Sequence, residues 1–439
     1  MRIGYPRILM AMVLALSHLL FVITVERAVA ETYDFKIDEF ESKPFEWSGY
    51  AEVKYEHLNL DKESAFYGLN FYNDPRDTLN RSTGTMQLEL GYKKGLAAFN
   101  TVLNARAAVD DLGGSDRADV FEAKLSLKPT PSVTVDLGKK VFKWGKGYAW
   151  NPVGFINRPK DPNNPEDSLE GYLGVGIDLI KSFSGPLQTL ALTAVLLPVW
   201  TDVNGDFGKK DHVNFAAKLY LLYRDTDIDL MAFVGDSRST RFGIDFSRNL
   251  ATNFEIHAEY AYLTDLEQKY LTEAGLVATR RRSVSQYLLG LRYLTKNDIT
   301  TIFEYYHNGA GFTKSELDRF YELVDDANQQ FITTGSDNFF QSARTISRMG
   351  YSAPQAGRNY LYLKISQKEP FDILYFTPGI IGIFNIDDAS YSLSPEMLYT
   401  GFTNWEIRVR YTYLGGSRFT EFKEKQNQHK AELRVRFFF

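Results

Sequence analysis

Side chains that commonly carry catalysis or bind metals are sparse in this chain. Its 439 residues include six histidines and no cysteine, so neither a disulfide framework nor a thiolate metal site can form. Apart from His18, near the N-terminus, no two histidines lie close in sequence, and no metal-ligand spacing is present. We therefore expect no catalytic residue, no metal and no cofactor.

One short segment, Tyr306-His307-Asn308-Gly309, invites comparison with an acyl-transfer site. It resembles part of the motif of the outer-membrane phospholipases, in which a serine follows the histidine by two residues. Because position 309 is glycine, no nucleophile stands beside the base. We interpret His307 as an interfacial residue at a strand end and expect the protein not to be an enzyme.

A two-residue alternation of apolar and polar side chains dominates the sequence. Near its beginning, Trp47, Ala51 and Val53 fall on one face, whereas Glu52 and Lys54 fall on the other. The last ten residues repeat the pattern. Such alternation indicates strands with one apolar and one polar face. We count about eighteen of these strands, or about sixteen if one hairpin is miscounted.

The connections between these strands mostly alternate in length. The longer connections are 61–81, 111–118, 143–170, 199–212, 264–283, 309–358 and 415–428. Short turns such as 93–95 and 295–298 separate them. Short turns at one end and long loops at the other are typical of closed outer-membrane barrels, whose short turns face the periplasm. The predicted fold class is all-β, an antiparallel transmembrane β-barrel.

The chain begins with the features of an export signal. Arg2 and Arg7 precede an apolar run, and Ala28-Val29-Ala30 offers small residues at a cleavage position. We expect the following division: 1–30, signal peptide; 31–44, periplasmic extension; 45–439, barrel with long loops at 143–170 and 309–358. Cleavage removes three arginines and one glutamate, so the net charge becomes more negative than −5, which argues against a nucleic-acid partner.

If this protein resides in a membrane, β-strands rather than helices must cross it. The most apolar later stretch, 190–200, is too short to cross as a helix and contains Pro198. Backbone groups in lipid need internal partners, so a closed barrel is the remaining solution. The 27 tyrosines and 32 phenylalanines suit the membrane–water boundary.

The chain ends on Phe437-Phe438-Phe439, directly after an alternating strand. This ending resembles the C-terminal signature by which bacterial outer-membrane proteins engage the barrel assembly machinery. The resemblance implies the cell outer membrane of a Gram-negative bacterium. It also implies two partners: outer-membrane lipid, and the assembly machinery through Phe439.

The connection at 143–170 has the most unusual composition, rich in glycine, proline and tryptophan. Folded inward it would form a constriction, with tryptophans available to stack on ligands; packed on the barrel rim it would be a rigid outer loop. The candidate constriction residues are Lys143, Trp144, Lys146, Trp150 and Arg158. Tryptophan–glycine loops of this type resemble those of porin-like barrels, including alginate-export-like barrels.

The polar faces of the strands would line the lumen. The candidate lumen charges are Lys54, Arg106, Arg292, Glu304, Arg408, Arg410, Arg434 and Arg436. The basic residues of the last two strands either form cross-strand ladders with acids, worth roughly 0.2–1 kcal/mol per pair, or attract anionic solutes into the pore.

The longest connection, 309–358, contains a predicted helix. Ser315 can cap it, and Leu317, Phe320 and Val324 recur at helical spacing. This apolar stripe would be buried at the barrel mouth, in the lumen as a partial plug, or in a packed external lid.

Together these features predict a porin-like outer-membrane channel for passive or weakly selective diffusion of small hydrophilic solutes, which requires no cofactor. The alternative is a plugged or partner-filled barrel that acts as a scaffold or sheath for another protein, such as an electron-carrying cytochrome. Either protein could form a homo-oligomer.

Overall fold

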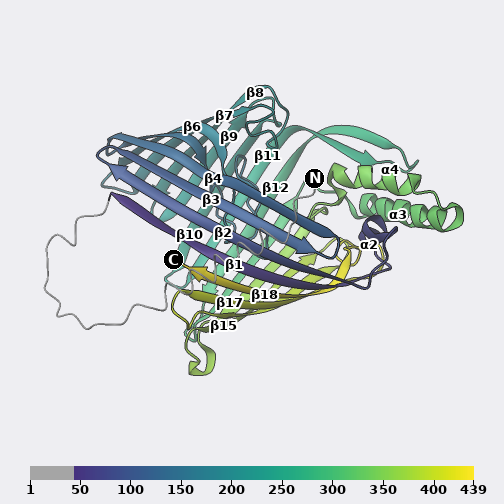
Figure 1. Ribbon diagram of the computed structural model, residues 1–439. Helices are drawn as coiled ribbons and strands as arrows, with labels where there is room; N and C mark the ends of the chain where they lie inside the picture. The colour runs from purple at the N-terminus through teal and green to yellow at the C-terminus, as the bar shows by residue number, and fades with distance from the viewer. Residues whose placement is uncertain (1–43) are drawn as a thin grey trace, which may run out of the picture.

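Backbone hydrogen bonds join eighteen antiparallel strands into one sheet that closes on itself (Figure 1). Closure occurs because β1 (Phe45–Leu60) pairs both with β2 (Thr78–Lys94) and with β18 (Asn427–Phe438). The structure, a computed structural model, describes residues 44–439. The signal peptide expected at 1–30 and all but the last residue of the expected extension lie outside the described residues. The predicted fold class is confirmed.

The remaining strands follow one another around the barrel in chain order. They are β3 (Ala97–Asp110), β4 (Gly113–Thr130), β5 (Val133–Lys140), β6 (Tyr172–Ser182), β7 (Leu187–Val199), β8 (His212–Tyr223), β9 (Thr226–Val234), β10 (Arg241–Ala251), β11 (Phe254–Leu271), β12 (Val277–Leu294), β13 (Ile299–Asn308), β14 (Asn359–Gln367), β15 (Phe376–Asn385), β16 (Tyr391–Tyr399) and β17 (Trp405–Gly415). We call the end where β1 begins and β18 finishes the terminal end, and the opposite end the helical end.

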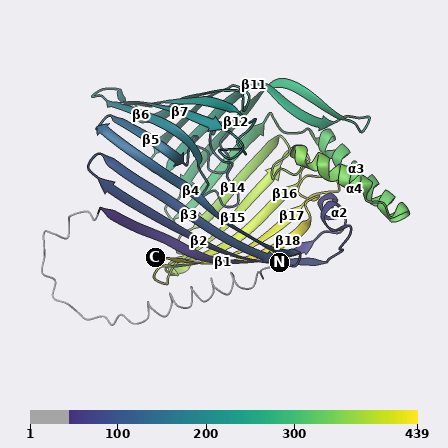
Figure 2. The ribbon, with the colours of Figure 1, turned by 45° about the horizontal axis from the view of Figure 1, so that its top comes forward.

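The two ends differ as the connection lengths predict, with two exceptions. The segments 111–118 and 264–283, expected to be loops, are mostly strand, because β3–β4 and β11–β12 continue as tight hairpins. The β11–β12 hairpin shifts register between Leu263 and Leu266 and then pairs as far as Leu271. Figure 2 shows it reaching well beyond its neighbours at the helical end.

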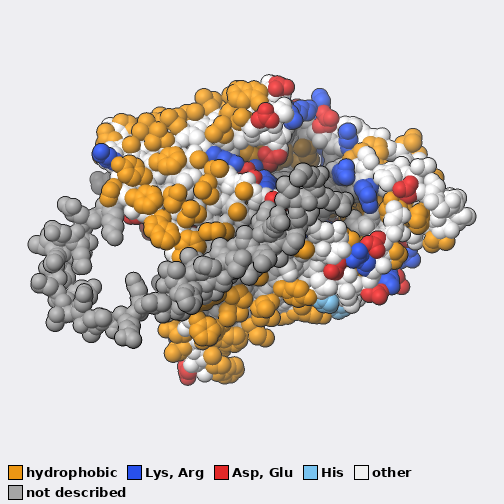
Figure 3. Space-filling view, in the orientation of Figure 1, with side chains coloured by type: hydrophobic (Ala, Val, Ile, Leu, Met, Phe, Trp, Pro, Cys, Tyr) orange, Lys and Arg blue, Asp and Glu red, His pale blue; other side chains and the backbone are white. Residues whose placement is uncertain are grey.

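The barrel wall is apolar outside and largely polar inside. On β1, Trp47 and Val53 are 61% and 49% exposed, whereas Glu52 on the opposite face is only 9% exposed. Figure 3 shows hydrophobic side chains covering much of the outer surface of the strands. Alternation of this kind suits a barrel that has hydrocarbon around it and a polar lumen.

β15 contains Pro378 and Gly379, two residue types that commonly interrupt a strand. Its pairing with β16 nevertheless runs without a register shift from Phe376 to Phe384. The pairing with β14 starts only at Gly379, so Pro378 lies beyond that ladder. A proline has no N–H group to donate to a strand ladder. Because the β14 ladder does not include Pro378, no hydrogen bond to β14 is lost there.

Short helices form a cluster at the helical end. They are α2 (Ala65–Phe71), α3 (Lys314–Thr334), α4 (Asn338–Ile346) and the π-helical turn η2 (Ser347–Tyr351). Phe320, Phe340 and Tyr351 are buried at their common core, which also includes Leu271 of β11. The helix predicted in 309–358 is therefore confirmed. Its apolar stripe packs against the other helices, beyond the helical end of the barrel wall. None of the helices in residues 44–439 is both long and apolar enough to cross a membrane.

The residue that caps α3 differs from the prediction. Thr313, rather than Ser315, accepts a hydrogen bond from the backbone N–H of Glu316. The Glu316 side chain accepts in return from the backbone N–H of Thr313, 2.9 Å away. This reciprocal arrangement is a capping box, and it satisfies two amides that a helix start leaves free.

Replacing Thr313 with alanine should destabilise α3 by about 1 kcal/mol, because one amide loses its acceptor. The measurement is hydrogen exchange of the amides in the first turn of α3. Ser315→Ala is the matched control and should leave exchange nearly unchanged. Equal effects of the two variants would contradict the assignment of the cap.

Glu316 also ties the helical cluster to the β11–β12 hairpin, through an ion pair with Arg280. Burial acts to raise the pKa of the Glu316 carboxyl, but Arg280 and the Thr313 N–H outweigh burial and hold that pKa below its ordinary value of 4.5. A carboxyl whose folded-state pKa is depressed stabilises the fold above its unfolded pKa and loses that contribution as the pH falls through the folded value.

The helical cluster should therefore loosen when the pH falls below about 4.5, while the barrel stays folded. Limited proteolysis between residues 314 and 334, followed across pH with an acid-tolerant protease, measures this. Glu316→Gln should be weakened at neutral pH and should show much less change with acid. An unchanged acid response in that variant would show that another group controls the cluster.

Candidate functional site

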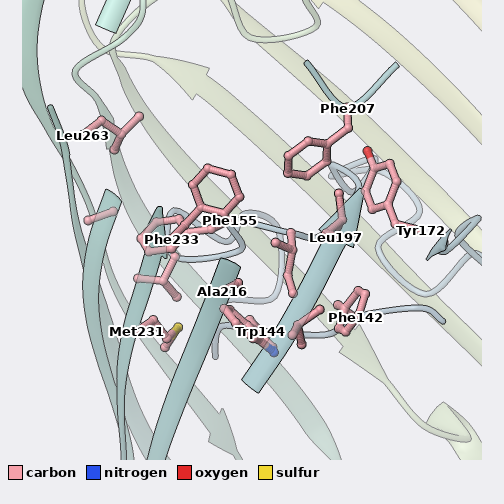
Figure 4. Packing of buried hydrophobic residues seen from close by; sticks show 14 of the residues in the cluster. Phe142, Trp144, Phe155, Tyr172, Leu197, Phe207, Ala216, Met231, Phe233 and Leu263 are labelled. Carbon is pink, nitrogen blue, oxygen red and sulfur yellow. The ribbon is translucent and has the colours of Figure 1, made fainter. Parts of the chain in front are cut away.

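Residues 141–171, which connect β5 to β6, fold into the barrel; we call them the inward loop. Val153, Phe155 and Ile156 are fully buried in one cluster with inward-facing residues of β7, β8, β9 and β11. Figure 4 shows Phe155 packed beside Phe233 of β9. Gly243 of β10 makes room, because a Cβ there would lie 2.9 Å from Val153 Cγ1. Hydrophobic contact thus holds the inward loop against one side of the wall.

Glu259 of β11 is the first of two wall carboxylates that hold the backbone of the inward loop. Its Oε1 accepts from the N–H groups of Lys146 and Gly147, both at 2.6 Å, and from Asn151 Nδ2 at 2.9 Å. Its Oε2 accepts from the N–H of Val153 at 3.3 Å. Hydrogen bonds to a charged group are worth roughly 1.5–3 kcal/mol each, so this carboxylate is a strong anchor.

Glu304 of β13 is the second anchor. It accepts from the backbone N–H groups of Tyr148 and Ala149, the latter at 2.9 Å. His257 Nε2 lies 3.0 Å from the same carboxylate, and the exposed fraction of the Glu304 side chain is 0%. Together the two anchors accept from the four consecutive backbone amides of residues 146–149 and from that of Val153, in a segment without regular secondary structure.

The glycines of this segment allow the carboxylates to come close. Gly145 has a φ of 103°, a conformation that L side chains rarely adopt. A Cβ at Gly145 would also lie 2.7 Å from Glu259 Oε1. Glycine at position 145 is therefore required by the approach of Glu259. Gly147 is required inside the loop, because a Cβ there would lie 2.0 Å from the Trp150 carbonyl oxygen.

The far part of the inward loop reaches the opposite wall. Asn164 Oδ1 accepts from Arg410 Nη1 at 2.9 Å, and Asp167 Oδ1 lies 3.1 Å from Arg434 Nη1. Arg436 is 3.6 Å from the same Asp167 atom. The side chains of Arg410 and Arg434 are only 2% and 4% exposed. The inward loop thus crosses the lumen from the β7–β13 side to the β17–β18 side.

The structure buries both tryptophans that were expected to be available to ligands. Trp144 is 4% exposed in the cluster around Phe155, and Trp150 is 8% exposed. The ring of Trp150 stacks on Tyr306 of β13, with centroids 5.1 Å apart. Neither ring offers a free face for stacking on a solute in this conformation.

The basic candidates of the inward loop have different surroundings. Lys143 is exposed and lines a cavity beside the loop. Lys146 Nζ lies 2.9 Å from Asp229 of β9, so it pairs with the wall. Arg158 forms ion pairs with Glu170 and Asp206, near the start of β6. Lys143 is therefore the candidate best placed to meet a solute.

The predicted lumen charges lie on the inner face. Lys54, Arg106, Arg434 and Arg436 line one cavity, and Arg410 lines a second. Glu304 is the anchor described above. Arg292 shares its face of β12 with Leu288, which is buried inside the barrel, and Arg408 pairs with Glu406 at 3.3 Å. Several of these charges are paired in ladders, among them Arg436 with Glu52 at 2.7 Å.

Beside the inward loop lie cavities of mixed polar and apolar lining, along β1–β4 and β18 and, at the helical end, also along β15–β17. At the helical end a cavity of about 510 Å³ includes Glu56 and Lys430. A cavity of about 260 Å³ follows, with Lys54 and Arg106. Nearer the terminal end, one of about 450 Å³ includes Lys143 and Glu89. These cavities succeed one another along the same side of the wall.

His307 lies away from this space. Its Nδ1 is 2.8 Å from Asn359 Oδ1, and its ring stacks on Tyr287 with centroids 4.8 Å apart. Within residues 44–439, no three His, Asp or Glu side chains are arranged to hold a metal ion.

The closed antiparallel barrel of eighteen strands, with one loop folded into its lumen, is porin-like in fold. No protein-family model and no curated protein matches its sequence. Among solved structures, OccAB1 of Acinetobacter baumannii is 10% identical with a TM-score of 0.54, covering 90% of this chain and 96% of that one. A triple mutant of Rhodopseudomonas blastica porin is 12% identical with a TM-score of 0.43, covering 90% and 100%.

The two anchors can be tested separately by hydrogen exchange. Glu259→Gln should speed exchange of the Lys146, Gly147 and Val153 amides, and Glu304→Gln that of Tyr148 and Ala149. Loss of about 1.5–3 kcal/mol corresponds to roughly tenfold to a hundredfold faster exchange.

Each variant is the control for the other, because both remove one buried charge from the same wall. Uniform acceleration of the whole inward loop in both variants would indicate general unfolding and would contradict separate anchoring.

Proposed function

We propose that this protein is a porin-like channel of the outer membrane, for passive or weakly selective diffusion of small hydrophilic solutes. The observation that carries the proposal is the row of three cavities, each with charged side chains in its lining, that follow one another along β2. The inward loop crosses the lumen beside these cavities and serves as the constriction. Lys143, rather than the buried tryptophans, is the constriction-loop residue that we expect to contact solutes.

The charges along this route favour weak rather than strong selectivity. In the middle cavity, five basic side chains face four acidic ones: Lys54, Arg106, Arg117, Arg434 and Arg436 against Glu52, Asp119, Asp167 and Glu170. Charges of mixed sign produce a small net field, which neither excludes nor strongly concentrates one sign of ion.

The proposed location is the outer membrane of a Gram-negative bacterium, with the terminal end toward the periplasm. The short turns lie at that end, as periplasmic turns do in such barrels. Phe439 sits there too, and exchanges two backbone hydrogen bonds with Gly49, at 3.0 and 3.1 Å. We propose that Phe439 is the residue presented to the assembly machinery before β18 pairs with β1.

Conductance of the purified, refolded protein in a planar bilayer tests the channel directly. Discrete current steps are expected, with a small reversal potential under a salt gradient. Folding is verified beforehand by the heat-dependent shift in gel mobility. A folded protein that never conducts would sink the proposal and favour a plugged or partner-filled barrel.

Arg106 offers a test of the route, because it is exposed to the middle cavity. Arg106→Glu should shift the reversal potential toward cation preference, since two units of charge change beside the path of the ions. Arg281→Glu, on the exposed β11–β12 hairpin, is the matched control. An equal shift in both variants would place the route elsewhere.

A further inference from the structure

The turn between β14 and β15 exposes an unusual run of apolar side chains at the terminal end. Phe371 is 94% exposed, Leu374 63%, Tyr375 54% and Ile373 50%. A 3-10 turn, η3 (Pro370–Asp372), lies within it. We call residues 370–375 the apolar foot. Apolar side chains this exposed in water would be unfavourable, so a group of them indicates a contact surface.

The backbone of the apolar foot holds these side chains outward. Phe371 and Tyr375 have φ values of 57° and 63°, in the left-handed region that bulky residues avoid. Glu369 turns its side chain inward, where Oε1 accepts from the Tyr375 N–H at 2.9 Å. The Glu369 N–H donates to the Phe376 carbonyl at 2.8 Å. A conformation of this kind persists only where the surroundings favour it.

The apolar foot continues the outer surface of the barrel. Figure 1 shows it projecting sideways from the wall below β15, and Figure 3 shows the hydrophobic surface continuing onto it. On the adjoining strand, Met397 faces outward with 57% exposure and pairs with Pro378. Phe402 in the next turn is 58% exposed. The foot is thus joined to the face that a barrel of this class presents to hydrocarbon.

We propose that the apolar foot inserts into the acyl chains of the phospholipid leaflet at the terminal end and anchors the barrel edge there. Lipid fits because the foot projects from the barrel and continues the hydrophobic outer surface of the wall. Lys368 is exposed just before the foot, and its long side chain can reach the headgroups, as lysines at an interface do. The inference requires membrane insertion but not conduction, so a silent barrel would leave it intact.

The absence of cysteine makes a site-directed test clean. Phe371→Cys and Leu374→Cys are labelled with a nitroxide in the full-length protein, refolded into phosphatidylcholine vesicles. Lys296→Cys is the matched control, because it lies exposed in the neighbouring turn of the same edge. Collision with dissolved oxygen and with a water-soluble nickel chelate is measured by power-saturation electron paramagnetic resonance.

The expected result is a higher collision rate with oxygen than with nickel at 371 and 374, and the reverse at 296. Nickel access at 371 and 374 equal to that at 296 would place the foot in water and overturn the proposal. Labels at 371 and 374 that are immobilised and reached by neither reagent would show that protein, such as a second copy of the chain, covers the foot; that outcome also overturns it. Heat-dependent gel mobility confirms that each labelled barrel is folded.

Discussion

A backbone N–H group removed from bulk water must find an acceptor within the protein, and the structure satisfies this requirement in two ways. In the wall, pairing of β1 with both β2 and β18 leaves no open sheet edge. In the lumen, the inward loop lacks a ladder of its own, so Glu259 and Glu304 supply carboxylate oxygens to its amides. The position of the loop therefore depends on two charged side chains as much as on its hydrophobic contacts.

Because of this anchoring, the two sides of the lumen differ. On the β7–β13 side the inner wall is partly apolar, and the loop covers it. On the β1–β4 side the wall is polar, and the cavities lie there. Where Asn164 and Asp167 reach Arg410 and Arg434, the loop supplies acceptors to basic side chains that have little contact with water. The same contacts therefore set both the shape of the lumen and the pairing of its charges.

The sequence predicts the barrel well because a two-residue period is a local signal, repeated in every strand. It predicts the site less well because the partners are distant: Gly147 and Glu259 are separated by 112 residues. Nothing near Trp150 indicates that Tyr306 will cover its ring. The cap of α3 could have been predicted: an acidic residue follows both Thr313 and Ser315 by three positions, but only Glu316 is the longer glutamate that a capping box favours.

The helical cluster shapes a second part of the lumen, and its hydrophobic core is separate from the cluster around Phe155 of the inward loop. Its core is closed by Phe320, Phe340 and Tyr351 outside the barrel. Phe66 and Asn70 of α2 nevertheless line the cavity at the helical end. Because regions with separate cores can open independently, loosening of the cluster would widen that cavity without releasing the inward loop. Different interactions therefore stabilise the mouth and the middle of the lumen. At the mouth they are the cap of α3 and its ion pair with Arg280; in the middle they are the two buried carboxylates that hold the inward loop.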